Sequence, residues 1–197
     1  MQFTESMIFI REDITTRWRD EEITIKQGWR SHREVNKQLR YSTGLIERCE
    51  ANFGIYLWAP EFANVHGTFP YEERPIIIEG HEWPHSEGYF QAMKAHGTPL
   101  WSKTKKEIAI VDPMDSWIIG QRLNGMRSNW NKIKDNIMMD AVRAKFQDPY
   151  LKALLRSTGD YPLVQLKNCP HWGSGYDGKG RNMLGVLLQN LRDELKN

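Results

Sequence analysis

Three polar side chains at helical spacing form the clearest candidate for a chemical site. Glu87, Gln91 and Lys94 follow one another at intervals of four and three residues, so on a helix beginning near Ser86 they share one face. A carboxylate, an amide and an amine on one side of a pocket can stabilise charge, hold a substrate and move a proton. A solvated helix face, with a first-turn glutamate favoured by the helix dipole, is the equally weighted alternative.

Arg127 and Trp130 form a second candidate group. A guanidinium can grip a phosphate, and an indole ring three residues later can stack on a base. The alternative is a helix start that Asn129 caps, with Trp130 buried in the core.

A glycine-rich stretch forms the third candidate. Four glycines fall within residues 173–180, just before a predicted helix. Such a loop lets backbone N–H groups approach a phosphate, and the start of the helix favours the anion. Lys179 and Arg181 add positive charge. A flexible connector is the alternative, and the stretch matches neither a Walker loop nor a dinucleotide fingerprint.

The string HEWPH at residues 81–85 matches the zinc-protease pattern H-E-x-x-H. That chemistry needs both histidines on one face of a helix. Pro84 lies inside the string, and a turn precedes it, so a helix is disfavoured there. We expect no metal site.

The elements that position these residues are predicted to be mostly helical. A β-branched run and a Glu-Gly turn predict a hairpin over residues 76–83. Capping, proline and apolar spacing predict the remaining elements. They are helices over 86–95 with Ser86 as N-cap, from Asp112-Pro113 to 125, over 130–146, and from Asp148-Pro149 to about 159, an extended segment over 161–166, and a final helix bearing Leu184, Leu187, Leu188, Leu191 and Leu195.

Composition limits the classes of protein that fit. With 197 residues, 40% hydrophobic and 26% charged, the chain fits one globular domain. We expect residues 1–50, read as strands or short helices, to be an N-terminal extension packed on a main domain over 51–197. A net charge of +2 does not demand a long nucleic-acid face. Two distant cysteines, no secretory signal and no long apolar run predict a cytoplasmic protein without a membrane partner.

Taken together, the chemical segments resemble the NADAR family, also called YbiA-like. The resemblance covers roughly residues 53–197 and rests on a specific combination of motifs in one order. These motifs stand at residues 80–94, 127–130, 145–146, 155–160 and 172–185. Three positions depart from the family pattern: an aromatic-Ser-Asn-Phe stretch reads Phe62-Ala63-Asn64-Val65, a common histidine is Gly88, and a common acid is Cys169.

The resemblance implies a mostly α (α+β) fold, a YbiA-like helical domain with a small β-hairpin. It implies an N-glycosidase that cleaves a ribosyl–base C–N bond without cofactor or metal. The implied substrates are ADP-ribosylated guanine in nucleic acid, or phosphoribosylated pyrimidine intermediates of riboflavin synthesis. The expected partner is therefore a nucleotide-like small molecule or an ADP-ribosylated nucleic acid, and the oligomeric state is left open.

Residue roles carried over with the resemblance divide into two sets. Glu87 would stabilise the cationic sugar or activate water, and Lys94 would protonate the leaving base or form a Schiff base. The expected catalytic residues are Glu87, Lys94 and Asp160. The expected substrate-binding residues are Asn64, Tyr89, Gln91, Arg127, Trp130, Trp172, Gly173, Gly175, Asp177, Gly178, Lys179 and Asn182.

Two other functions compete with hydrolysis. The departures at Gly88 and Cys169 suit a non-catalytic protein that binds ADP-ribose or NAD. A nucleic-acid-binding module whose aromatic side chains stack on exposed bases is the third hypothesis, and the low net charge disfavours it.

Overall fold

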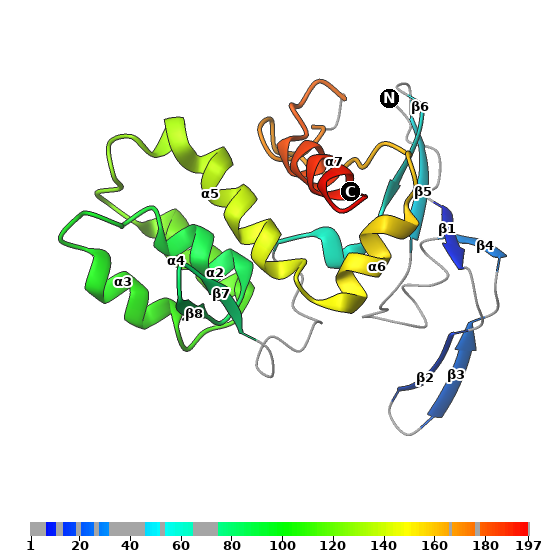
Figure 1. The fold of residues 1–197 in the computed structure, drawn as a ribbon, viewed down its shortest axis with the longest axis horizontal. Coiled ribbons are helices and arrows are strands. Elements are labelled where there is room, and N and C mark those ends of the chain that lie inside the picture. The colour runs from blue at the N-terminus through cyan, green and yellow to red at the C-terminus, as the bar shows by residue number, and fades with distance from the viewer. Residues whose placement is uncertain are drawn as a thin grey trace. The chain divides into compact units, whose positions relative to one another are not determined.

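The structure, a computed structural model, describes residues 7–10, 14–18, 21–25, 28–31, 46–51, 54–64, 75–165, 167–175 and 178–196, with side chains from Leu57 onward, Pro60 excepted. The chain divides into two compact units (Figure 1). Asn64–Ala153 form one, called the helical unit here, and Met1–Ala63 with Leu154–Asn197 form the other, called the mixed unit. The predicted boundary between an extension over 1–50 and a domain over 51–197 stays a prediction.

Helix α2 occupies the middle of the helical unit. It spans Ser86–Ala92 and packs against the strand β8 and the helices α3, α4 and α5. The other elements of this unit are β7 (Ile76–Ile78), β8 (His81–Trp83), α3 (Trp101–Ile108), α4 (Pro113–Arg122) and α5 (Trp130–Lys145). All seven residues of α2 are buried, so its polar side chains need partners inside the protein.

The predicted hairpin is confirmed. Strands β7 and β8 pair antiparallel, with Ile76 opposite Trp83 and Ile78 opposite His81. Glu79 and Gly80 both have positive φ, 51° and 75°, which suits the primed turns that join twisted strands.

The start of α2 was predicted one residue too late. His85, not Ser86, is the N-cap, with φ −167° and ψ 166°. Its Nδ1 accepts a hydrogen bond of 2.8 Å from the N–H of Gly88, and its Nε2 lies 3.0 Å from the carbonyl oxygen of Val111. The partners fix a neutral tautomer with the proton on Nε2. Serine is the commoner cap, which is why sequence reasoning preferred it.

The later helix starts follow the predicted signals except at one residue. Asp112 caps α4 through a 2.8 Å bond from the N–H of Asp115, with Pro113 at the first helical position. Asp148 likewise accepts from the N–H groups of Tyr150 and Leu151 at the start of α6 (Pro149–Ser157). Asn129 precedes α5 but makes no side-chain cap bond. Helix α3 was not predicted, because Leu100 at its N-cap position gives no capping signal.

Antiparallel strands form most of the N-terminal part of the mixed unit. The sheet order is β4 (Gly28–Ser31), β1 (Met7–Ile10), β5 (Ile46–Ala51), β6 (Gly54–Trp58), while β2 (Ile14–Trp18) pairs with β3 (Glu21–Ile25). The short helix η1 spans Pro60–Phe62. The predicted extended segment runs beside β6, where Leu57 and Leu163 form a parallel bridge.

Helix α7 (Met183–Glu194) buries Leu184, Leu187, Leu188 and Leu191, as its apolar spacing predicted. With six α-helices among the described residues and the small β7–β8 hairpin, the predicted mostly α (α+β) class is confirmed. In the part of the chain described here, no helix combines the length and apolar character that crossing a membrane would require.

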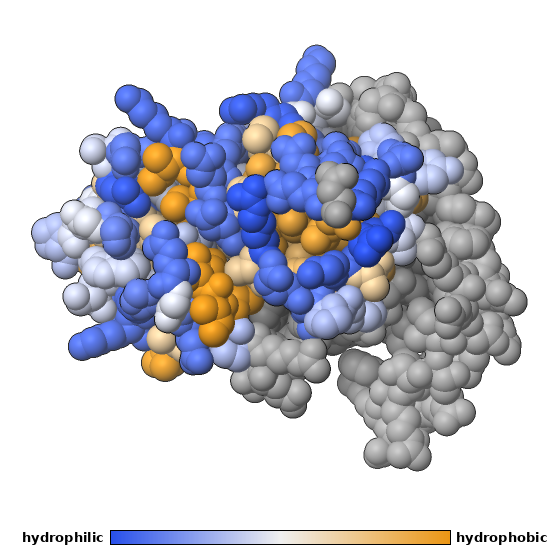
Figure 2. Space-filling model, in the orientation of Figure 1, coloured by the Kyte–Doolittle hydropathy of each residue, from blue (hydrophilic) through white to orange (hydrophobic). Residues whose placement is uncertain are grey.

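Apolar side chains also reach the surface of the helical unit. The large exposed ones are Ile77, Ile110, Met114, Trp117, Met126 and Tyr150. On the face drawn in Figure 2, apolar residues lie in several patches bordered by hydrophilic ones. Such separated patches are ordinary for a protein surface.

The neutral His85 cap should make stability depend on pH. Burial lowers the pKa of His85 below 6.5, outweighing its bond to Val111 and the charge of Asp112. The unfolded chain therefore binds a proton at higher pH than the folded chain does. We expect full stabilisation above about pH 6.5, falling as the pH drops towards the lowered pKa.

Urea unfolding from pH 5 to 8 measures this effect. His85→Ala should lower the free energy of unfolding at pH 8 by about 1–3 kcal/mol, since it removes a cap and leaves a buried N–H and C=O unpaired. It should also flatten the pH dependence. The matched control is His81→Ala on the exposed hairpin. Equal unfolding curves for the two variants would contradict the assignment.

Candidate functional site

The carboxylate of Glu87 is the centre of a buried polar cluster. Its Oε1 accepts a hydrogen bond of 2.6 Å from Nε2 of Gln91, and its Oε2 accepts one from Nδ2 of Asn64. Glu87 is only 3% exposed. A buried charge is costly unless hydrogen bonds stabilise it, and the two amides provide this stabilisation from opposite ends of the carboxylate.

Lys94 belongs to the same buried face. Its ammonium donates a 3.1 Å hydrogen bond to the carbonyl oxygen of Gly120 on α4. Burial lowers the pKa of Lys94, and the charge of Glu87 opposes that shift. An amine with a lowered pKa can release or take up a proton more readily than an exposed lysine. The alternative of a solvated face is therefore wrong for Glu87, Gln91 and Lys94, all of which are buried.

Gly120 lets α4 approach this face closely. A Cβ built on it would lie 1.8 Å from Oε1 and 2.9 Å from Cβ of Gln91. Any larger residue would displace the amide that holds Glu87, while Gly120 also supplies the carbonyl that binds Lys94. Sequence reasoning missed this residue, because a helix-interior glycine is only a weak signal of close packing.

Arg127 lies next to the end of this face, and Trp130 packs into the core. The N–H of Arg127 donates to the carbonyl of Lys94 at 2.8 Å, and its Nε donates to Oδ1 of Asn129 at 2.8 Å. That bond explains why Asn129 does not cap α5. The ring of Trp130 lies 5.0 Å from that of Phe90, and Trp130 is 7% exposed. Trp130 therefore contributes to core packing, as the alternative interpretation expected, and its stacking role stays a prediction.

Tyr89 points away from Glu87. It is buried, and its ring meets Trp83 edge to face at 5.2 Å. Burial, with the charges of Asp140 and Glu79, raises the pKa of Tyr89 to about 12. The phenol is therefore neutral at physiological pH.

The glycine-rich loop belongs to the mixed unit, and its N–H groups are largely used. Those of Gly173, Gly175 and Gly180 donate to the carbonyls of Cys169, Lys167 and Ser174 at 3.1, 3.1 and 2.7 Å. At the start of α7, the N–H groups of residues 183 and 184 donate to the carbonyls of residues 171 and 172. Each of these five N–H groups already has a backbone acceptor in the structure, and the phosphate-binding role of the loop stays a prediction.

Close packing explains why the loop contains glycine. A Cβ on Gly180 would meet the carbonyl oxygen of Gly173 at 2.3 Å, and one on Gly185 would meet that of Leu163 at 2.1 Å. These close contacts argue against the alternative of a flexible connector for the described part of the loop. Gly178 has φ 73°, a conformation that suits glycine.

Asn182 has a structural task in the same unit. Its Nδ2 donates to the carbonyl of Leu163 at 2.8 Å, and its Oδ1 accepts from the N–H of Gln165 at 3.0 Å. The side chain thus ties the start of α7 to the segment beside β6.

Three further predicted site residues of the mixed unit, Asp160, Trp172 and Lys179, are among the described residues. Asp160 is exposed and accepts from Nζ of Lys196 at 2.6 Å, and this bond lowers the pKa of Asp160. Trp172 is half-buried, with its ring 4.7 Å from that of His171. Lys179 is exposed, and Asp177 lies outside the described residues. The catalytic role of Asp160 and the binding roles of this set stay predictions.

The H-E-x-x-H string has no helical geometry. His81 is on β8, where its Nδ1 lies 3.0 Å from the carbonyl of Glu79, and His85 caps α2. Across the described ranges, no three His, Cys, Asp or Glu side chains gather in a way that could hold a metal ion.

The structure thus unites Asn64, Glu87, Gln91 and Lys94 in one cluster, with the backbone of Arg127 beside it. All five residues belong to the helical unit. The cluster combines a fixed negative charge with a buried amine, which is a pairing that can act on a developing cation and a leaving group.

Comparison with known proteins supports this chemistry. The NADAR domain matches residues 57–196 of the chain. N-glycosidase YbiA of Shigella flexneri is 42% identical over 135 residues, which is 66% of this chain and 82% of that protein. A riboflavin biosynthesis protein of Vibrio vulnificus is 35% identical over 149 residues, 72% of this chain and 38% of that protein.

A solved structure agrees with the sequence comparison. The NMR structure of Escherichia coli YbiA superposes with a TM-score of 0.59 at 36% identity, covering 71% of this chain and 82% of that one. The predicted enzyme class, a glycosidase, is confirmed by these relatives. Since the domain match spans most of the sequence, the chain belongs to the NADAR family.

Proposed function

We propose that this chain hydrolyses the C–N bond between a ribose and a base. The substrate is either ADP-ribosylated guanine in nucleic acid or a phosphoribosylated pyrimidine of riboflavin synthesis. The observation that carries the proposal is the buried Glu87 carboxylate, held by two amides within the face that also bears Lys94.

The chemistry of C–N cleavage suits these two groups. As the bond breaks, positive charge develops on the anomeric carbon, and the base leaves with the bonding electrons. A carboxylate fixed in a dry site stabilises that cation or activates the attacking water, because it need not reorganise during the reaction. Lys94 protonates the leaving base, for which its lowered pKa is suited.

The alternative role for Lys94 is nucleophilic. The neutral amine can add to the aldehyde of an opened ribose and lose water to form a Schiff base. Burial favours the neutral amine that this step requires. The two roles predict opposite pH dependence.

The names of the relatives support hydrolysis of small phosphoribosyl substrates in particular. Proteins of Vibrio vulnificus and Zea mays that match this chain are named riboflavin biosynthesis proteins. The competing proposal, a binder of ADP-ribose or NAD without turnover, draws on the departures at Gly88 and Cys169.

A turnover assay with both substrate classes tests the proposal. The full chain is incubated with an oligonucleotide that carries ADP-ribosylated guanine, and separately with the phosphoribosylamino-pyrimidines, and products are identified by mass spectrometry. Release of ADP-ribose or of ribose 5-phosphate identifies the substrate class. Tight binding of ADP-ribose without release of product from either would support the binding protein instead.

Glu87→Gln should abolish most of the activity. The variant keeps the side-chain shape but removes the charge, and it sets an NH2 group against the amide donors of Asn64 and Gln91. We expect kcat to fall by about 10²–10⁴-fold, with a circular-dichroism spectrum like that of the wild type. Glu82→Gln on the exposed strand β8 is the matched control. A rate within a few-fold of wild type would remove Glu87 from the mechanism.

The pH profile of kcat separates the two roles of Lys94. If the ammonium is the proton donor, kcat falls as the pH rises through the lowered pKa, which lies below 10.5. Lys94→Met should remove this alkaline limb and reduce kcat by about 10²–10⁴-fold, whereas the exposed Lys103→Met should not. A rate that rises with pH, together with a substrate adduct that borohydride reduction traps on Lys94, would contradict proton donation. It would support the Schiff-base role of Lys94 instead.

A further inference from the structure

A hollow lined by aromatic side chains lies on the other side of α2. Tyr89 and Met93 line it. Each follows Glu87 or Gln91 by two residues, and two residues correspond to a rotation of about 200° around a helix. The cavity measures about 230 Å³, and all its lining residues belong to the helical unit. It is therefore distinct from the carboxylate cluster.

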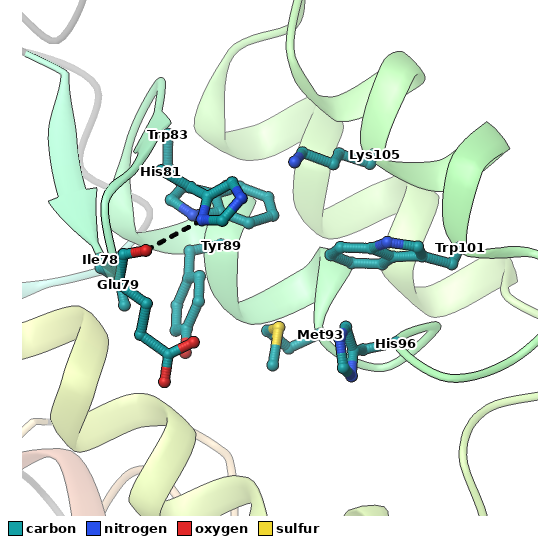
Figure 3. Close-up of a pocket in the computed structure, with 9 residues that line it drawn as sticks. All are labelled: Ile78, Glu79, His81, Trp83, Tyr89, Met93, His96, Trp101 and Lys105. Carbon is teal, nitrogen blue, oxygen red and sulfur yellow. Dashed lines mark hydrogen bonds between the residues drawn. The ribbon is translucent and has the colours of Figure 1, made fainter.

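Two indole rings and a lysine dominate this hollow. Figure 3 shows Trp101 across the cavity from Trp83 and Tyr89, with Lys105 at one edge. The rings of Trp83 and Trp101 are 6.1 Å apart and tilted by 50°, and Trp83 meets Tyr89 edge to face. The ring of His96 also meets Trp101 edge to face, at 4.8 Å, and none of these contacts is a parallel stack.

The ammonium of Lys105 lies over both indoles. Its Nζ is 5.4 Å from the ring centroid of Trp83 and 5.7 Å from that of Trp101. No ion pair joins Lys105 to a carboxylate of the described residues, although Glu79 lines the same cavity. His81 and His96 also line the cavity. A cation held beside aromatic rings, without an anionic partner in the described protein, can pair with an anion on a ligand.

The β7–β8 turn contributes Glu79 to the lining of the cavity. The positive φ of Glu79, 51°, follows from the primed turn that joins the two strands. The turn sets Glu79 and His81 at the mouth of the cavity (Figure 3).

We propose that this hollow is a second binding site, for a small planar aromatic compound that carries an anionic group. The ring packs against Trp101 and Trp83, and the anionic group pairs with Lys105. The volume is below the roughly 300–1,000 Å³ of pockets for drug-sized ligands, so one ring or two fused rings fit rather than a dinucleotide. A nucleoside monophosphate and an aromatic carboxylate share this chemistry. The site goes beyond the proposed hydrolysis and does not depend on it.

NMR of the indole N–H groups of the full chain tests the site. Adenosine monophosphate and indole-3-acetate are the probes, with adenosine and inorganic phosphate as the uncharged and ring-free comparisons. We expect at least one probe to shift the Trp101 signal, which Trp101→Phe assigns, and to bind more tightly than either comparison. The probe that binds with the higher affinity shows whether the site prefers a phosphate or a carboxylate.

Charge variants on α3 complete the test. Lys105→Met should weaken binding of that probe roughly three- to tenfold, Lys105→Arg should retain it, and the exposed Lys106→Met is the matched control. The proposal is overturned if neither probe moves the Trp101 signal, if phosphate alone moves it equally, or if Lys105→Met and Lys106→Met behave alike. Loss of the shift in Lys94→Met would also overturn it, since the ligand would then belong to the carboxylate cluster.

Discussion

The packing of the helical unit depends on one buried carboxylate, that of Glu87. Glu87 sits on a helix with no exposed residue, so its charge is tolerable only if donors surround it. One donor, Gln91, comes from the next turn of the same helix, and the other, Asn64, lies 23 residues earlier in the chain. A side chain at position 120 would collide with the amide of Gln91, and Gly120 lets α4 pack against that amide without displacing it. The close packing of α2 on α4 therefore also fixes the position of the charged group.

That constraint gives α2 two unlike faces. Glu87, Gln91 and Lys94 form a polar face, on which Gln91 donates to Glu87 and Lys94 donates to Gly120, while Oε1 of Gln91 has no partner among the described residues. Tyr89 lies on an aromatic face that packs on Trp83. Tyr89 and Trp83 belong to one apolar core, together with Ile76, Ile78 and Ile108. The apolar face anchors the helix, and the anchored helix holds the polar face still. Such rigid support is what a charged group needs if it is to act on a transition state without reorganising.

Sequence patterns predicted where helices and strands begin better than they predicted which faces of these elements are buried. The Glu-Gly turn and the Asp112-Pro113 start are local signals, and local bonds decide them. Burial of the Glu87 face was not predictable, because the same spacing serves a solvated helix and only tertiary packing distinguishes the two. The composition of the glycine-rich loop fits a phosphate cradle, but it does not reveal the backbone contacts that also call for glycine. Gly180 packs on Gly173 within the loop, and Gly185 packs on Leu163, 22 residues earlier in the chain.

The departure at Gly88 leaves the hydrogen bonds of the carboxylate cluster in place. Gly88 has little room for a side chain, since a Cβ there would lie 3.0 Å from both His85 and Ile108. The imidazole of His85 fills that space while it caps α2, and the bonds of Glu87 are unaffected. At Cys169, burial acts to raise the pKa, but the N–H groups of Trp172, His171 and Gly173 stabilise the thiolate, and the net pKa is lowered. The thiol thus serves as an acceptor for that turn, a task that a carboxylate at the same position would also perform. Both substitutions therefore have local structural explanations, and neither requires the loss of catalysis that the binding-protein hypothesis assumes.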